Sequence, residues 1–150
     1  MLFCMIFKRG VTSVAIKING VNHFAISVAD LEESIAWYER VFGFSVLDRS
    51  EIPGTGVRVS HMQAPGFLLE IFCAPDSAPL AEERKVPNLD FLTQGNKHIS
   101  FGVPDAHILL DEFKRLGVHV AFVAEVDGTY GVFINDNTGN LIEIFEEGHA

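Results

Sequence analysis

Two histidines and two glutamates hold matching places in two similar stretches of the chain. Residues 22–30 read NHFAISVAD and residues 97–105 read KHISFGVPD, which aligns His23 with His98. Further along, Glu70 lies within LLEIF and Glu143 within LIEIF. Imidazole nitrogens and carboxylate oxygens are donors that divalent metal ions accept. The chain therefore predicts a metal site in which His23, Glu70, His98 and Glu143 are the ligands.

The types of these four residues fit a half-buried cation. Each glutamate interrupts an apolar strand, where an unpaired carboxylate is costly unless it meets a cation, is neutralised or faces water. Two neutral imidazoles and two carboxylates make a +2 ion formally neutral. This set of donors suits nickel, cobalt, iron or manganese, or zinc with expanded coordination. A single histidine in a strand is more often a hydrogen-bonded residue at the rim of the sheet than a metal ligand. Here that interpretation would require the same coincidence in both halves of the chain, so the repeat favours a metal site.

The elements around these residues repeat as well. Asp30 and Asp105 each end a strand at a place where a carboxylate can cap a helix, and Gly43 and Gly117 stand where those helices should end. Short runs of strand-like pattern follow in both halves, at residues 44–48, 57–63, 68–72, 118–123, 132–135 and 141–145. The predicted order is β-α-β-β-β, twice, in an α+β fold.

The boundaries follow from this repeat. We expect an N-terminal extension at residues 1–19 and a single domain at 20–150, with module one at 20–74 and module two at 96–147. The linker between them, residues 75–95, contains Pro75, Pro79 and Pro87. It is longer than most connections within a domain, so it is either a functional lid or a mobile tether. The apolar N-terminal stretch is an extra strand, a dimer contact or a disordered tail.

Composition excludes several classes of function. A net charge of −9 and a pI near 5.0 argue against nucleic-acid binding, which depends on clustered lysine and arginine. The apolar start is too short to span a bilayer and has no basic residues before it, so we expect neither a membrane partner nor a signal peptide. Cys4 and Cys73 form no disulfide or zinc pattern, which favours a reducing, cytoplasmic location.

The residues resemble those of the glyoxalase/bleomycin-resistance/extradiol-dioxygenase superfamily, also called the vicinal oxygen chelate superfamily. The resemblance covers about residues 19–147 and is carried by the strand 21–28, the helix 30–43 with Trp37 and Tyr38, and the run 136–143, DNTGNLIE. It implies a cupped mixed β-sheet built from two tandem βαβββ modules. The ligand order His, Glu, His, Glu is similar to the glyoxalase I branch, and methylmalonyl-CoA epimerases lie nearby.

This resemblance also implies a reaction. The metal would chelate two adjacent substrate oxygens and stabilise the enediolate formed when a carboxylate, Glu143 or Glu70, removes the α-proton. The implied enzyme is a lyase or isomerase, similar to lactoylglutathione lyase, for a small 2-oxo or α-hydroxy-carbonyl compound. Apolar residues after Glu70 depart from a glutathione site and predict an apolar substrate pocket at Phe72 and Phe145. Arg84 would grip an anionic tail, unless its charge run is simply solvated.

Other functions stay open on the sequence alone. An Fe(II)-dependent ring-cleaving dioxygenase would use the same fold, and a drug-binding resistance protein would use it without catalysis. Paired modules in this superfamily often form a homodimer, so we expect one here. The histidines outside the repeat, His61, His107, His119 and His149, have no counterpart in the other half and receive no role.

Overall fold

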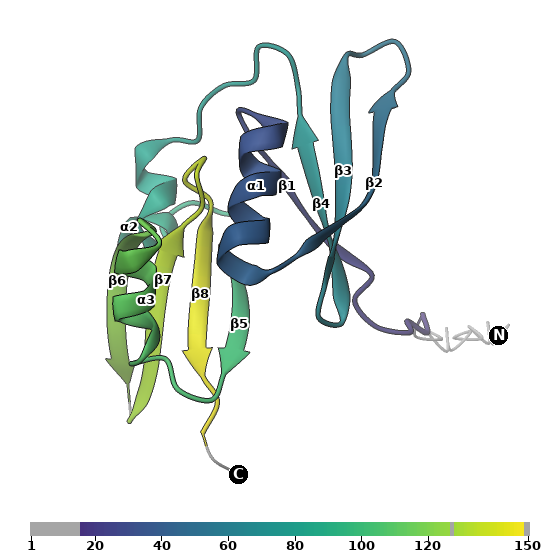
Figure 1. The fold of residues 1–150 in the computed structure, drawn as a ribbon. Coiled ribbons are helices and arrows are strands. Elements are labelled where there is room, and N and C mark those ends of the chain that lie inside the picture. Colours follow the sequence, from purple (N-terminus) through teal and green to yellow (C-terminus); the bar gives the residue numbers. More distant parts are fainter. Residues whose placement is uncertain (1–15, 127, 149–150) are drawn as a thin grey trace, which may run out of the picture.

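The computed structural model describes residues 16–126 and 128–148. The predictions for Cys4, His149 and most of the N-terminal extension lie outside these residues. Module one contains β1 (His23–Ser27), α1 (Leu31–Phe42), β2 (Ser45–Ile52), β3 (Val57–Ala64) and β4 (Phe67–Cys73). Module two contains β5 (Ile99–Val103), α3 (Leu109–Arg115), β6 (His119–Val126), β7 (Thr129–Asn135) and β8 (Leu141–Glu146) (Figure 1).

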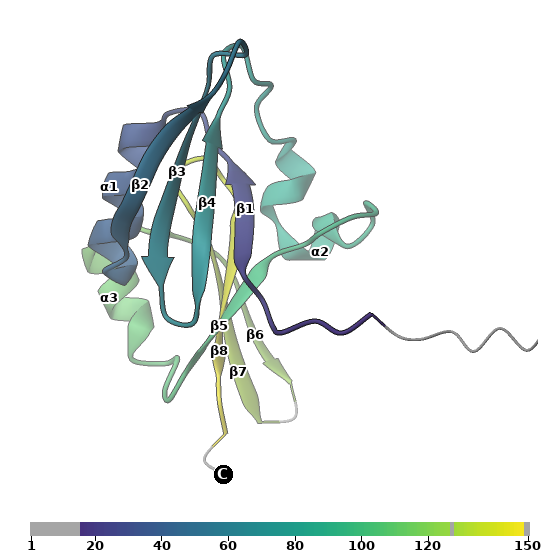
Figure 2. The ribbon, with the colours of Figure 1, turned by 90° about the vertical axis from the view of Figure 1, so that its right-hand side faces the viewer.

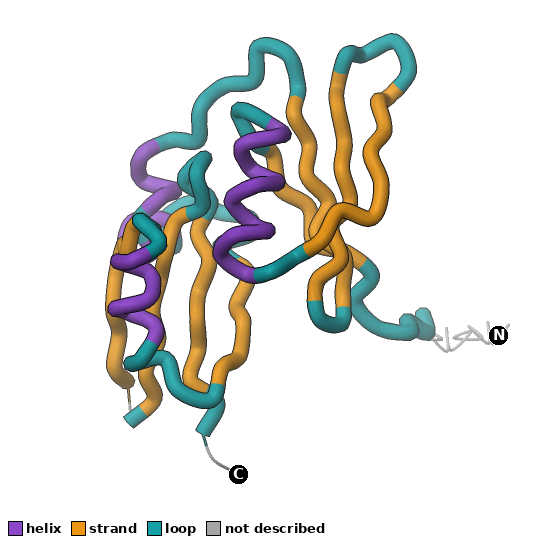
Figure 3. Tube along the Cα trace, in the orientation of Figure 1, coloured by secondary structure: helices purple, strands orange, loops and turns teal. Residues whose placement is uncertain are grey.

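The repeated β-α-β-β-β order is therefore confirmed. Backbone pairing divides the expected cupped sheet into two four-stranded mixed sheets, ordered β1-β4-β3-β2 and β5-β8-β7-β6. In each sheet the first strand of the module runs parallel to the last one, and the other neighbours are antiparallel. The two sheets stand side by side with α1 between them, as the tube view also shows (Figure 3).

Helix α1 begins and ends where the sequence predicts. The Asp30 carboxylate accepts the backbone N–H of Glu33 at 2.9 Å, and Gly43 ends the helix in the left-handed conformation at φ 67°. One side of the helix is buried against the sheet of module one, through Leu31, Ile35, Trp37 and Tyr38. Against that side pack Met62, Leu69 and Ile71, each at most 3 % exposed.

Helix α3 is shorter than predicted. The Asp105 carboxylate does accept the backbone N–H groups of His107 and Ile108, but these residues form a turn, and the regular helix starts at Leu109. Phe113 is the residue of α3 that the core buries. The second module thus has a weaker helical cover than the first.

The two modules are joined by an aromatic cluster and by polar contacts. Phe42 and Phe44 at the end of α1 pack on Phe101 of β5, with ring centroids 5.2 and 6.0 Å apart. The Tyr38 hydroxyl donates to Asp136 at 3.1 Å, in the turn between β7 and β8. Burial raises the pKa of Tyr38 well above its ordinary value, and the Asp136 charge adds to this shift. This link keeps module two fixed on α1.

The linker has structure of its own. It contains a 3-10 helix, η1 (Glu82–Lys85), and the short helix α2 (Pro87–Asp90). Asp90 is only 1 % exposed and forms ion pairs with Arg84 and with Lys97, the latter at 3.6 Å. These pairs connect η1 and α2 to Lys97, just after the linker.

None of the helices within residues 16–126 and 128–148 has the length and apolar character needed to cross a bilayer.

Candidate metal centre

The first predicted ligand pair lies on the open face of the module-one sheet. Glu70 on β4 is the register partner of Ala25 on β1, so Glu70 and His23 share a face by strand alternation. His23 Nε2 lies 3.5 Å from Glu70 Oε2. The other imidazole nitrogen of His23, Nδ1, is 2.8 Å from Asn22 Oδ1. When Nδ1–H donates to Asn22, the lone pair of Nε2 is left free toward Glu70, as a metal ligand requires.

The second pair repeats this geometry in module two. His98 precedes β5 directly, Glu143 on β8 is the register partner of Ser100, and His98 Nε2 lies 3.4 Å from Glu143 Oε2. The His98 ring meets Phe133 of β7 edge-on at 5.1 Å. Both pairs are half-buried rather than sealed, so an ion held there would keep access to a substrate.

The spacing within each pair fits a shared cation. Separations of 3.4 and 3.5 Å are longer than a good N–H···O hydrogen bond. Two donor atoms that each lie about 2.1 Å from one ion are roughly 3.0 Å apart at a right angle and roughly 3.4 Å apart at the tetrahedral angle. The atoms and distances therefore suit one divalent ion, with each pair supplying two neighbouring ligands.

A single chain does not assemble all four ligands. Within residues 16–126 and 128–148, no three His, Cys, Asp or Glu side chains come together in a way that could hold a metal ion. The physical reason is the placement of α1. It lies between the two sheets and covers the core face of the module-one sheet (Figure 2). Strand alternation puts His23 and Glu70 on the opposite face of that sheet.

A third polar residue stands beside the first pair. His61 on β3 is the register partner of both Glu70 and Asp48. Its Nδ1 is 2.8 Å from Asp48 Oδ1, and its Nε2 is 3.2 Å from Glu70 Oε1. The hydrogen bond to Asp48 raises the pKa of His61 above its ordinary 6.5, and the negative charges of Asp48 and Glu70 act in the same direction. The His61 ring thus lies between Asp48 and Glu70 and restricts the Glu70 carboxylate.

The internal repeat gives no signal for His61, because module two has no histidine at the corresponding place. The alternation within VRVSHMQA places His61 on the same face as Glu70 once the hairpin β3–β4 is in register. A two-residue turn at Pro65 and Gly66 joins the two strands and sets their register. The sequence could therefore have placed His61 beside Glu70 through this turn.

Module two has aromatic residues at the positions that correspond to Asp48 and His61 of module one. Glu143 has Phe133 as its register partner on β7, and Phe133 in turn pairs with Phe122 on β6. With Phe91 of the linker, these rings and His98 line a pocket of about 360 Å³. The repeat likewise gives no signal for these three phenylalanines.

The predicted substrate residues lie in different surroundings. Phe72 and Phe145 each stand two residues after a glutamate that the sequence predicts as a ligand, on the same face of the strand, and Phe145 is 40 % exposed. Arg84 instead forms an ion pair with Asp90 and donates to the carbonyl of Asn96 at 2.6 Å. These contacts already occupy the Arg84 guanidinium within the linker.

Comparison with known proteins agrees with this fold and these motifs. Residues 20–144 match the model of the Glyoxalase/Bleomycin resistance protein/Dioxygenase superfamily. The chain belongs to this superfamily.

Individual relatives span most of the chain. It is 31 % identical over 137 residues to an ethylmalonyl-CoA/methylmalonyl-CoA epimerase from Cereibacter sphaeroides, covering 85 % of this chain and 97 % of that protein. It is 24 % identical to a protein named glyoxylase I 4 from Arabidopsis thaliana, covering 85 % and 70 % respectively. A glyoxalase family protein from Enterococcus faecalis has the same fold, with a TM-score of 0.72 at 19 % identity over 85 % of this chain and 98 % of that one.

Proposed function

We propose that this chain is a metal-dependent isomerase or lyase that moves a proton on the carbon next to a carbonyl group. Its substrate is a small 2-oxo, α-hydroxy-carbonyl or 2-substituted acyl compound. The observation that carries the proposal is the matched pair of His–Glu contacts, at 3.5 Å in module one and 3.4 Å in module two. The similarity to an epimerase over nearly its whole length supports the isomerase side of this proposal.

The ligands of the ion are His23, Glu70, His98 and Glu143. A divalent cation, when bound, supplies a Lewis acid that draws electron density from the substrate carbonyl and offsets the negative charge of the enediolate. The protein contributes the rest, namely a fixed orientation of the substrate, an apolar wall and a carboxylate that accepts the proton.

Glu143 is the carboxylate that we assign as the base. Glu70 is held on one side by the His61 imidazole at 3.2 Å, which restricts its movement. Among the described residues, His98 is the one basic side chain within ion-pair distance of Glu143, and its strand neighbour is the Phe133 ring. Glu143 is therefore freer to turn toward a substrate carbon, whereas Glu70 is suited to a constant ligand role.

The apolar surroundings define the part of the substrate that does not react. Phe133 lies beside Glu143 and Phe122 lies beyond Phe133 in the same row, while Phe145 and Phe72 continue the two ligand-bearing faces. Such rings hold an aliphatic or thioester-linked substituent and keep water from the site where the proton is removed.

The four ligands come together when two copies of the chain associate. The open face of module one from one copy then lies against the open face of module two from the other, and each His–Glu pair completes the other. The chain thus forms a homodimer with two equivalent sites, and each site draws on both subunits. Exposed Phe122 and Phe145 become covered in this arrangement.

Mixing two variants tests the ligand set and the shared site together. His23→Ala and His98→Ala should each lose the metal, measured as bound Mn²⁺ after dialysis. Unfolding and refolding the two variants together should restore metal to about a quarter of the sites, since half of the dimers are mixed and one of their two sites is intact. Mixed dimers without recovered metal would contradict the shared site, and a His98→Ala protein with full metal content would contradict the ligand assignment.

The reaction is tested by proton exchange. Incubation in D₂O with a 2-methylacyl thioester and with a panel of 2-oxo compounds should give metal-dependent deuterium uptake at the α-carbon of at least one of them. Oxygen consumption with a catechol in place of exchange would favour a ring-cleaving dioxygenase. Tight drug binding without either reaction would favour a resistance protein.

A further inference from the structure

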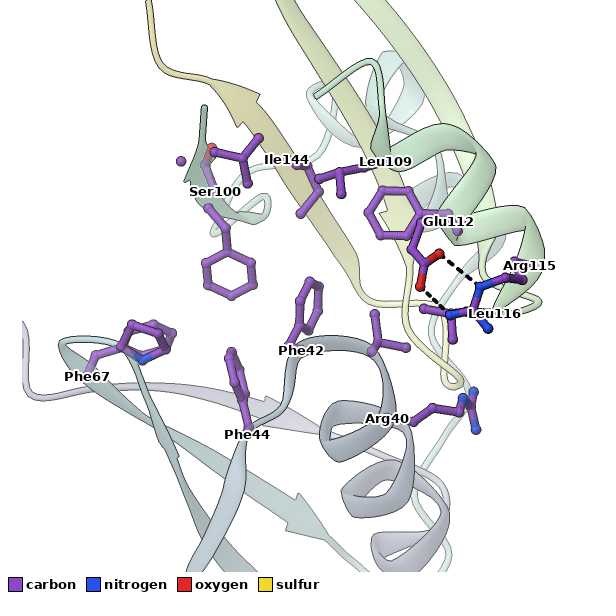
Figure 4. A pocket seen from close by; sticks show the side chains of 16 residues that line it. Arg40, Phe42, Phe44, Phe67, Ser100, Leu109, Glu112, Arg115, Leu116 and Ile144 are labelled. Atoms are coloured by element: carbon purple, nitrogen blue, oxygen red, sulfur yellow. Dashed lines mark hydrogen bonds and ion pairs between the residues drawn. The ribbon is translucent and has the colours of Figure 1, made fainter. Parts of the chain in front are cut away.

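A second pocket lies on the helix side of the molecule. Its volume is about 580 Å³, and it lies where the end of α1, the strand β5 and the helix α3 meet (Figure 4). Most of its wall is apolar and comes from both modules, including Phe42, Phe44, Phe67, Phe101, Phe113 and Ile144. The volume is within the roughly 300–1,000 Å³ typical of sites for small molecules.

This pocket is separate from the proposed metal centre. Ile144 lines the pocket, and it follows Glu143 directly on β8, so the two side chains point to opposite faces of the sheet. None of the four proposed metal ligands is part of the pocket wall. A molecule bound there would contact the back of the strand whose front carries Glu143.

The charged groups at the edge of the pocket are arranged unevenly. Arg115 is neutralised by a two-point contact with Glu112, both on α3. Arg40 of α1 also belongs to the wall, and within the described part of the chain it forms no ion pair. In Figure 4 the side chains of Arg40 and Arg115 lie on one side of the pocket, and Phe67 lies on the other. An unpaired cation beside an apolar pocket is notable in a chain with a net charge of −9.

We propose that this pocket binds a small amphipathic carboxylate. Its apolar body lies among the phenylalanine rings, and its carboxylate pairs with Arg40. Burial of an aliphatic or aromatic body among these rings is favourable by roughly 25 cal/mol of binding free energy per Å² of apolar surface removed from water. The arginine supplies the planar donor pair that fits a carboxylate. The volume accommodates one small molecule and is too small for a folded peptide segment.

Calorimetric titration with decanoate tests this proposal, with decanol as the uncharged probe of equal chain length. Both probes are used below the concentration at which they aggregate, on intact protein treated with a chelator. Decanoate should bind once per chain and more tightly than decanol. Arg40→Gln should weaken decanoate binding about fivefold and leave decanol unchanged. The matched control is Lys114→Gln, which removes one positive charge from α3 outside the pocket wall and should change neither affinity.

Two further variants locate the binding. Leu109→Trp places a larger side chain in the pocket wall and should abolish binding of both probes, with folding checked by circular dichroism. His98→Ala should leave decanoate binding intact even though the proposed metal centre is lost, which separates this proposal from the preceding one. The absence of saturable decanoate binding would overturn it, as would equal losses in Arg40→Gln and Lys114→Gln. A change from dimer to monomer in Leu109→Trp would also overturn it, because the pocket would then be a contact between copies.

Discussion

The open faces of the two modules carry the same His–Glu pair in different surroundings. Both sheets have an irregularity at the same place in their outer strand, after Val46 in β2 and after Val120 in β6. Past it, the row across module one reads Asp48, His61, Glu70, and the row across module two reads Phe122, Phe133, Glu143. One glutamate is therefore fixed by an imidazole, and the other lies beside a phenyl ring.

This difference shows that two copies of one module can surround the same pair of residues with different side chains. Both modules keep the same strand order and carry a His–Glu pair at matching positions. The positions beside the glutamates also point to the open face, so their side chains can differ between the modules without changing the core on the opposite side of the sheet. In module one these positions hold polar residues, and in module two they hold phenylalanines.

Exchanging the glutamates for their amides gives the sharpest test of this difference. Glu143→Gln should reduce α-proton exchange about 100- to 10,000-fold, since the amide cannot accept the proton. Glu70→Gln should act mainly by weakening Mn²⁺ binding, so that excess metal restores part of its exchange rate. The measurements are deuterium uptake by NMR and bound Mn²⁺, with the exposed Glu51→Gln as control. Equal responses to added metal in both variants would remove the distinction between the two glutamates.

Giving module one the aromatic residue of module two tests the His61 contact. His61→Phe should lower Mn²⁺ affinity about 10- to 100-fold, as expected when the partner that orients a ligand is lost. His107→Phe is the matched control, because His107 only stacks on Tyr130 and a phenyl ring can keep that contact. Unchanged metal affinity in His61→Phe would mean that Glu70 does not depend on His61 for its orientation.

Removing a ring from the row formed by Phe122 and Phe133 should weaken substrate binding more than metal binding. Phe122→Ala is expected to raise KM about tenfold and to change metal affinity little, since the ring contributes apolar contact alone. Val123→Ala serves as its control, because Val123 is similarly exposed but belongs to the alternate face of β6. A loss of metal in Phe122→Ala would place this ring in the ligand framework instead.

The smallest expected effect is on the titration of His61. NMR should give a pKa above 6.5 for His61, and Asp48→Asn should bring it back toward that value because the main hydrogen bond is lost. A raised folded-state pKa stabilises the fold below pH 6.5, and this contribution disappears as the pH rises through the raised pKa. The free energy of unfolding of Asp48→Asn should thus fall below that of the parent in acid and approach it at high pH. An identical pKa in both proteins would contradict the contact.

Local patterns were sufficient for most of the fold. The Asp30 cap, the Gly43 stop and the alternation in LLEIF and LIEIF predicted elements that are present in the structure, because caps and strand periods act over a few residues. The length of α3 was overestimated, since a carboxylate that caps a helix can equally support a turn. The importance of His61 was missed because it depends on strand register rather than on the repeat.

The sequence by itself determined the repeated module, the order of its elements and the matching positions of the two His–Glu pairs, because each of these follows from spacing along the chain. Only the tertiary structure decided that the two His–Glu pairs do not come together among the described residues of one chain, since this depends on how the two sheets and α1 are placed. It also decided which neighbours each glutamate has and that a second pocket exists behind β8, because both result from contacts between residues distant in sequence.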